Sequence, residues 1–358
     1  MGRDSQQDDT ATRQPRTSDR AWSLLLLALG LLACVSTREA RWTRLAVQTE
    51  GPCLESAMAW DPARDVFVLY GGRDRNWDFR TETWEWSPES PAWRRCAETS
   101  DRKPSGRLTH TMVWDATRER MLLFGGSNLE NSFNDTWSFE GSTSRWVRLE
   151  TTGDPPPRSQ HGMVHDPDTD TLIVFGGRGP DHQPLHDTWL LDLDSLRWTR
   201  QEPTGTAPQP RARDHVQMAR DPLTGTIVMR GASLGSGLAD ETWHFDARAR
   251  TWTLMPTDRE PRGMEHGFLC PVDALGGLVF FGFESGWLGR SPQTWLYRPQ
   301  ARSWTLLQVT GEEPTSPMDH GQAASDGRHL LVLGGFGGPG VPADAGLTPR
   351  GALWRLVP

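Results

Sequence analysis

The chain has 358 residues, and its formal net charge at pH 7 is -8. This length allows one large all-β domain as well as two smaller domains, and the acidic charge argues against nucleic acid as a partner. The 18 Trp stand against only 2 Tyr, which requires a structural cause that recurs along the chain.

The N-terminal segment has the pattern of a targeting sequence. Residues 1–20 are polar, and residues 24–33 form an unbroken run of ten apolar residues or Gly. A run of this length is too short to cross a bilayer as a helix and is typical of a signal peptide, which we predict over residues 1–33.

The apolar run ends in Leu-Leu-Ala-Cys at Cys34 and resembles the lipobox of bacterial lipoproteins. This resemblance implies acylation of Cys34 and cleavage before it, with residues 34–40 as a lipidated tether. The acyl chains would anchor the exported protein to a membrane of the bacterial cell envelope, in the periplasm or at the cell surface. The alternative is an ordinary signal peptide in which Cys34 is incidental.

Three further cysteines follow, and export would place them where disulfides persist. Under that condition Cys53 and Cys96 can form a bridge. Cys270 lies in an apolar run and is expected to be a small buried hydrophobe. No two cysteines have the spacing of a zinc site, and we predict neither a metal nor another cofactor.

A repeat of 51 to 54 residues organises the rest of the chain. Six apolar runs end in a glycine doublet or its remnant, around Gly72, Gly126, Gly177, Gly231, Gly282 and Gly335. Each run is followed by a Trp that is usually preceded by Thr, at Trp84, Trp137, Trp189, Trp243, Trp295 and Trp354. Five of these have a second Trp nine positions later, at Trp93, Trp146, Trp198, Trp252 and Trp304.

Each repeat predicts four β-strands. A short apolar run that ends in Gly fits a strand buried on both faces. Two Trp nine residues apart fit two further strands joined by a tight turn, and the segment before each apolar run supplies a first strand. Six such units predict an all-β, six-bladed propeller of four-stranded antiparallel blades.

The sixth repeat lacks its second Trp, because the chain ends soon after Trp354. The missing pattern occurs at the other end, where Arg41, Trp42 and Thr43 copy Arg197, Trp198 and Thr199. We therefore predict that the N-terminal segment supplies the outer strand of the sixth blade and closes the ring.

These features resemble the kelch repeat family over residues 40 to 358. The glycine doublets, the spaced aromatic residues and an Arg-x-x-His pattern, at Arg107 with His110 and at Arg158 with His161, carry the resemblance. It implies one six-bladed kelch-type β-propeller over residues 41–358.

Residues that recur in the blades are expected to serve the scaffold. Five histidines lie in first strands, at His110, His161, His215, His266 and His320. We expect hydrogen-bonded imidazoles that buttress neighbouring blades rather than a metal site. Acids stand two residues before Trp at Glu82, Asp135, Asp187 and Glu241, and we expect them to cap turns rather than to act as acid/base pairs.

Candidate binding residues are those that break the repeat on the variable loops, which emerge on one face of the propeller. They are Arg73, Arg75, Trp77, Arg178, Asp181, His182, Glu284 and Trp287. Aromatic rings suit the C–H face of a sugar or an apolar side chain, and Arg suits carboxylates. An acidic sugar or an acidic peptide segment is therefore the expected ligand.

The sequence favours a noncatalytic binding module for a protein, peptide or glycan. The alternative is a sugar-acting enzyme that resembles kelch mutarotases of the sialic-acid type, with Arg73, Arg178 and Glu284 in the central funnel. A copper oxidase of the galactose oxidase group is disfavoured because the only tyrosines are Tyr70 and Tyr297. A structural envelope component is the third class. We assign no catalytic residues.

Overall fold

The computed structural model describes residues 40–45, 54–74, 76–203, 205–206, 208–231, 237, 239–262, 264–284, 292–314, 321–334 and 352–358, without the side chains of residues 264–266 and 284. All of them belong to the unit of residues 39–358. The predicted signal peptide and Cys34 lie outside the described residues. Within the described part of the chain, no helix has the length and hydrophobicity that a membrane crossing requires.

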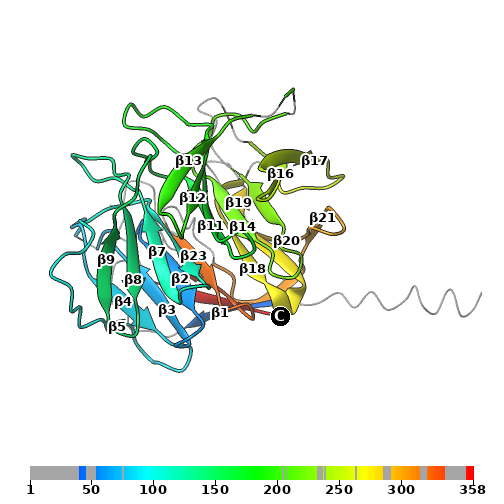
Figure 1. The fold of residues 1–358 in the computed structure, drawn as a ribbon. Helices are drawn as coiled ribbons and strands as arrows, with labels where there is room; N and C mark the ends of the chain where they lie inside the picture. Colours follow the sequence, from blue (N-terminus) through cyan, green and yellow to red (C-terminus); the bar gives the residue numbers. More distant parts are fainter. Residues whose placement is uncertain are drawn as a thin grey trace, which may run out of the picture. The chain divides into compact units, whose positions relative to one another are not determined.

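The strands form six sheets, and each sheet is one blade (Figure 1). Blade 1 comprises β2 (Ala57–Asp61), β3 (Val66–Tyr70), β4 (Thr83–Trp86) and β5 (Arg94–Arg95). Blade 2 comprises β6 (Thr111–Asp115), β7 (Arg120–Phe124), β8 (Thr136–Glu140) and β9 (Arg145–Leu149). Blade 3 comprises β10 (Gly162–Asp166), β11 (Thr171–Phe175), β12 (Thr188–Asp192) and β13 (Arg197–Gln201).

The second half of the chain repeats this arrangement. Blade 4 comprises β14 (Gln217–Arg220), β15 (Ile227–Arg230), β16 (Thr242–Asp246) and β17 (Thr251–Met255). Blade 5 comprises β18 (Met264–Val272), the short helix η1 (Asp273–Leu275), β19 (Gly277–Glu284), β20 (Pro292–Arg298) and β21 (Ser303–Leu306). Blade 6 comprises β23 (Gln322–Ser325), β24 (Leu330–Leu333), β25 (Leu353–Val357) and β1 (Ala40–Leu45), with β22 (Val309–Gly311) as a fifth strand.

The N-terminal strand closes the ring, as the sequence predicts. β1 pairs antiparallel with β25, with Trp42 opposite Leu356 and Arg44 opposite Trp354, and the two strands lie side by side in blue and red (Figure 1). β22 follows β21 of blade 5 in the chain and pairs in parallel with β1 of blade 6. This pairing, which the repeat does not predict, links blade 5 to blade 6.

One contact recurs among the Trp residues of the outer strands. In four blades the indole N–H of this Trp donates to a Thr hydroxyl at or near the start of the third strand of the preceding blade, whereas Trp93 and Trp198 do not make this bond. This bond joins Trp146 to Thr83 at 2.8 Å, Trp252 to Thr188 at 2.9 Å, Trp304 to Thr242 at 2.9 Å and Trp42 to Thr294 at 3.1 Å. Each ring therefore fills the space between two blades and satisfies its one donor there.

The glycine doublets are required by close packing between strands. Gly71 and Gly72 have φ of 69° and 83°. A Cβ on Gly72 would lie 2.4 Å from the carbonyl oxygen of Leu54, and one on Gly71 would lie 2.8 Å from the ring of His110 in the next blade. Only Gly fits such a position at no steric cost.

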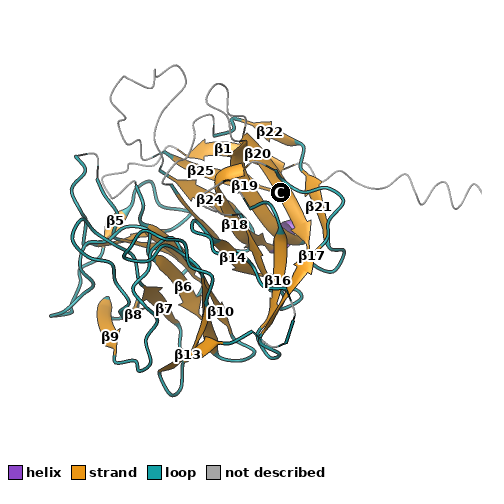
Figure 2. Ribbon diagram, turned by 90° about the horizontal axis from the view of Figure 1, so that it is seen from above, coloured by secondary structure: helices purple, strands orange, loops and turns teal. Residues whose placement is uncertain are grey.

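The first strands are innermost, and Figure 2 shows β5, β9, β13, β17, β21 and β22 at the periphery. Long connections, between second and third strands and between blades, emerge on one side, which we call the loop face. The turns within each pair of first and second strands, and of third and fourth strands, emerge on the short-turn face. Arg41 pairs with Val357. The neighbouring Leu356 pairs with Leu330, the first residue of β24 after the short turn from β23. The chain therefore enters the propeller from the short-turn face.

Candidate functional site

A cavity of about 260 Å³ occupies the centre of the ring. It is lined by residues at the start of each inner strand, which places it in the half of the channel next to the loop face; we call it the channel cavity. Its polar lining includes Glu55, Ser56, Thr109, His110, Gln160, His161, His215, Gln217 and Gln322. Its apolar lining includes Met58, Met112, Met163, Phe268 and Leu269. Concave sites of mixed character like this one are where proteins commonly hold small ligands.

Two histidines of the lining are buried scaffold residues. Burial and the nearby Arg107 lower the pKa of His110 to about 3, and burial with Arg158 holds the pKa of His161 well below 6.5. Both imidazoles are therefore neutral at neutral pH. The ring of His161 packs edge-on against Phe124 of the preceding blade at 5.3 Å. It buttresses that blade as expected, but without a hydrogen bond at either nitrogen.

The expectation that His215 belongs to the same series is wrong by one residue. Val216 takes the place of His161, because its side chain lies against Gly176 as the ring of His161 lies against Gly125. His215 instead shares a positive φ, 54°, with Gln160 at 57°. His215 is thus a channel-lining residue that breaks the repeat, which the histidine spacing alone concealed.

Asp214 fixes the orientation of His215. Its Oδ1 lies 2.9 Å from Nδ1 of His215, while its Oδ2 accepts a hydrogen bond from Nε of Arg178 at 2.8 Å. Burial would raise the pKa of Asp214, but His215 and Arg178 outweigh burial and lower it. The sequence analysis singled out Arg178 and missed Asp214, which is fully buried beside it.

Two of the acids before Trp, Asp135 and Asp187, pair with buried arginines, and the expectation that these two cap turns is wrong. Asp135 accepts two hydrogen bonds from the buried guanidinium of Arg107, at 2.7 and 3.0 Å, and one from the indole of Trp137 at 2.7 Å. Asp187 accepts the equivalent bonds from Arg158, at 2.8 and 2.9 Å, and from the indole of Trp189. In each case burial would raise the pKa of the carboxyl, but the Arg lowers it. These groups hold the blade together and are not available for acid/base chemistry.

Arg73 and Trp77, two of the predicted binding residues of blade 1, lie on the loop face, outside the channel cavity. The guanidinium of Arg73 lies 4.6 Å from the ring centre of Phe79 and 5.9 Å from that of Trp77. Trp77 is 44% exposed with φ of 70°. Asp74 shapes the loop by accepting backbone N–H groups of Asn76 and Asp78, so Trp77 is presented by an ordered turn.

The predicted residues of blade 3 play different roles. Arg178 is ion-paired with Asp214 of blade 4, and 38% of its side chain is exposed. Asp181 accepts the backbone N–H of Gln183 within its own turn, and the next residue, His182, is exposed with φ of 63°. None of these three lines the channel cavity, and neither does Arg73, so the funnel site of a mutarotase-like enzyme gains no support from them.

Several predicted residues lie outside the described part of the chain. Arg75 and Trp287 are among them, as is the side chain of Glu284. Cys53 also lies outside it, so its bridge to Cys96 stays a prediction. Cys96 is buried, and burial raises the pKa of its thiol. Cys270 is buried as expected, and burial raises its pKa to about 12.

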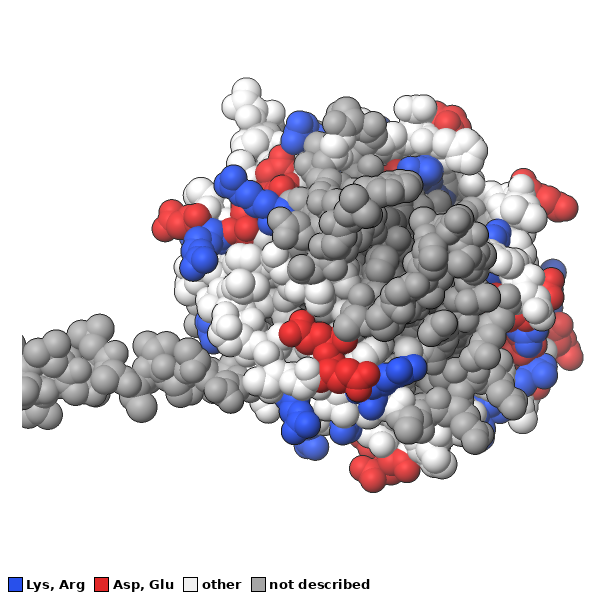
Figure 3. Space-filling model, turned by 180° about the vertical axis from the view of Figure 1, so that it is seen from behind, with Lys and Arg blue, Asp and Glu red and all other residues white. Residues whose placement is uncertain are grey.

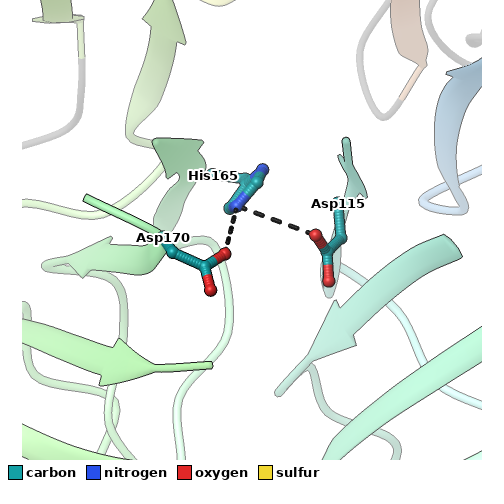
Figure 4. Close-up of side chains that lie close together, drawn as sticks. All are labelled: Asp115, His165 and Asp170. Atoms are coloured by element: carbon teal, nitrogen blue, oxygen red, sulfur yellow. Dashed lines mark ion pairs between the residues drawn. The ribbon is translucent and has the colours of Figure 1, made fainter. Parts of the chain in front are cut away.

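One group of side chains on the short-turn face has the composition of a metal site (Figure 4). Nε2 of His165 lies 3.6 Å from Asp170 and 3.8 Å from Asp115. Arg118, however, donates to both carboxylate oxygens of Asp170 at 2.9 and 2.7 Å, and Arg120 donates to Asp115 at 3.1 Å. The carboxylates already have cationic partners, and the group therefore serves to join blades 2 and 3.

Residues 28–164 and 142–335 of the chain match the family described as the KLHDC2/KLHL20/DRC7 Kelch-repeats domain. The chain belongs to this kelch-repeat family. The match covers all six glycine positions and agrees with the six blades of the structure.

The chain is also similar to several curated proteins. It is 27% identical over 341 residues to Adagio-like protein 3 of Oryza sativa subsp. japonica, covering 85% of this chain and 52% of that protein. It is 28% identical over 345 residues to Adagio protein 3 of Arabidopsis thaliana, covering 85% and 53%. A shorter match, 34% over 108 residues, covers 29% of this chain and 9% of dynein regulatory complex subunit 7 of Chlamydomonas reinhardtii. The chain thus spans about half the length of the Adagio relatives.

Proposed function

We propose that this chain is an exported, lipid-anchored kelch propeller that acts as a noncatalytic interaction module and binds a protein partner on its loop face. The exposed Trp77, held by an ordered turn over Arg73, is the observation that carries the proposal. An aromatic residue in a rigid, exposed setting is typical of the anchors that dominate protein interfaces. A peptide or glycan is the other class of ligand that such a surface suits.

A second apolar side chain extends this surface. Leu129 is 83% exposed, and it lies in the loop between β7 and β8, which is equivalent to the loop that carries Trp77. We refer to Trp77 and Leu129 as the loop-face pair. Large exposed apolar residues on neighbouring loops favour burial against a partner.

The relatives support a protein rather than a nucleic acid as partner. One of them is named as a subunit of a dynein regulatory complex, and a kelch propeller is an architecture consistent with protein interaction. In the face that Figure 3 presents, acidic and basic side chains lie next to one another in small mixed groups. The described residues on this face show no basic stripe of the kind that nucleic-acid binding needs.

Binding is tested by alanine substitution on both faces. Trp77→Ala and Leu129→Ala should each weaken the partner's affinity by more than about 1 kcal/mol if they are anchors. Leu223→Ala and Arg248→Ala, at exposed positions in short turns, should leave affinity unchanged. Arg118 and Asp170 are unsuitable controls, because they join two blades. Weakening by the short-turn variants alone would refute the proposal.

Anchoring is tested separately by metabolic labelling with a fatty-acid probe. The wild-type chain should take up the label and partition with membranes, and Cys34→Ala should do neither. Equal labelling of both chains would refute the anchor and leave the binding proposal standing.

A further inference from the structure

The outer strands of the propeller differ in charge from blade to blade. Two residues after the outer-strand Trp, four blades have an exposed Arg, and blades 4 and 5 have an exposed Leu instead. The arginines are Arg44, Arg95, Arg148 and Arg200, and the leucines are Leu254 and Leu306. Charged side chains on an edge strand hinder its pairing with the edge of another molecule. Blades 4 and 5 therefore lack a protection that the other blades have.

Blade 4 has a second device that protects its edge. Pro256 follows β17 directly and is exposed. Proline has no backbone N–H and cannot continue a ladder of strand hydrogen bonds. Blade 5 has neither device, because the run from Ser303 to Gly311 contains no Pro and no charged residue.

This run forms an edge that continues from blade 5 into blade 6. β21 is the outermost described strand of blade 5, β22 is the outermost described strand of blade 6, and residues 307 and 308 connect them. We call residues 303–311 the uncharged edge. Its exposed residues are Ser303, Thr305, Leu306, Gln308, Thr310 and Gly311. A long exposed edge without charge is a template for a further strand.

The two ends of the uncharged edge carry opposite charges. Arg302 precedes it and Glu312 follows it, and both are exposed. When two copies of one strand pair antiparallel, the start of each lies opposite the end of the other. A pairing centred on Leu307 brings Arg302 of each copy opposite Glu312 of the other, and Thr305 opposite Val309. Pairs of opposite charge and of β-branched residues stabilise such a sheet, so the uncharged edge is complementary to itself.

The outer strands of blades 2 and 3 are not self-complementary in this way. An antiparallel pairing centred on β9 would bring Arg145 opposite Arg148, and one centred on β13 would bring Arg197 opposite Arg200. Like charges directly opposite each other destabilise a sheet. Self-pairing is therefore favoured at blade 5 and opposed at these two blades.

We propose that the uncharged edge is an interface between two copies of this chain, which pair antiparallel about a two-fold axis. An edge that is paired with its own copy has no further strand to accept, so the assembly stops at two chains. The interface uses none of the residues of the loop-face pair and depends on neither the proposed partner nor the proposed anchor.

The test is sedimentation velocity of the purified full chain, in a mild detergent that keeps the apolar N-terminal run in solution. Over about 1 to 100 µM, the chain should show a reversible equilibrium between monomer and dimer. A chain that stays monomeric over this range would overturn the proposal, and so would assemblies larger than two chains.

A matched pair of substitutions locates the interface. Leu306→Arg gives blade 5 the residue that four other blades have at this position, so it should melt like the wild type and weaken the dimer at least about tenfold. Leu254→Arg makes the same change at the equivalent position of blade 4 and should leave the dimer unchanged. Equal effects of the two substitutions, or a dimer that survives Leu306→Arg, would contradict the assignment.

Charge reversal tests the antiparallel arrangement. Arg302→Glu and Glu312→Arg each place like charges opposite one another twice in the dimer, and each should weaken it at least about fivefold. The variant with both changes restores opposite charges and should recover the wild-type affinity. Loss of the dimer in this double variant would show that Arg302 does not face Glu312, and the proposed pairing would then be wrong.

Discussion

Individual residues recur at the same position in several blades of this propeller for reasons of charge and packing. Asp135 and Asp187 each neutralise a guanidinium that is fully buried and also hold the indole of the Trp two residues later. Blade 1 departs from this pattern, because Glu82 pairs instead with Arg80, whose side chain is 29% exposed, and with Arg95, whose side chain is 62% exposed. The same repeat position thus has very different energetic weight in different blades.

This contrast predicts unequal effects of equivalent substitutions. Asp187→Ala leaves the buried charge of Arg158 uncompensated and should lower the free energy of unfolding by about 3–5 kcal/mol. Glu82→Ala removes partly exposed ion pairs and a hydrogen bond from the backbone N–H of Thr81, and should cost no more than about 2 kcal/mol. Denaturant melts of the two variants measure the difference, and equal losses would contradict the assigned roles.

The buried histidines predict a pH dependence of stability. Their folded pKa values lie below the ordinary 6.5, so below that pH the unfolded chain binds more protons than the folded one. Stability is therefore complete above pH 6.5 and falls on acidification, by about 1.4 kcal/mol per pH unit for each His. Val216 occupies the equivalent position in blade 4, so His161→Val introduces a residue that the chain already uses there. This substitution should remove the contribution of one His from the pH dependence of stability. Unfolding free energies measured between about pH 7 and pH 5 test this, and an unchanged slope would show that His161 titrates normally.

At the scale of elements, the propeller is joined by contacts between successive blades. Trp42 is fully buried, donates to Thr294 and packs on Phe281 with ring centres 4.7 Å apart. Trp146 occupies the same position between blades 1 and 2, where it donates to Thr83. The terminal strand β1 is therefore bound to its neighbour by the same means as an internal outer strand.

Because Trp42 and Trp146 have equivalent roles, removing either side chain should lower the free energy of unfolding by a similar amount. Trp42→Ala and Trp146→Ala should each lower the free energy of unfolding by about 3–5 kcal/mol, since each leaves a cavity of one indole between two blades. Thermal and denaturant melts measure both. A Trp42→Ala chain that melts like the wild type would show that the ring is not closed by β1.

The strands and the closure could be predicted from the sequence because their signals recur. The spacing of Trp84 and Trp93 repeats in four more blades, and the copy of that pattern at Trp42 identified the strand that completes the ring. The pairing of β22 with β1 has no such counterpart, since it depends on where the end of blade 5 meets blade 6.

The candidate site was less predictable, because its contacts cross between blades. Arg178 stood out as a residue that breaks the repeat, but its partner Asp214 lies in the next blade. His215 appeared to belong to a histidine series until the register placed Val216 in that position.

The whole molecule has two unlike faces. The short-turn face carries ion pairs between blades, such as Arg118 with Asp170 and Arg220 with Asp166, and is the side from which the chain enters. The loop face carries the mouth of the channel cavity and the loop-face pair. The proposed partner site lies on the loop face.

The most direct test of this division is photo-crosslinking in intact cells that express the full chain. A photoreactive residue replaces either Leu129 on the loop face or Leu223 on the short-turn face, which are 83% and 59% exposed. The account predicts a discrete protein adduct from position 129 and none from position 223. An adduct from position 223 alone, or none from either position, would contradict it.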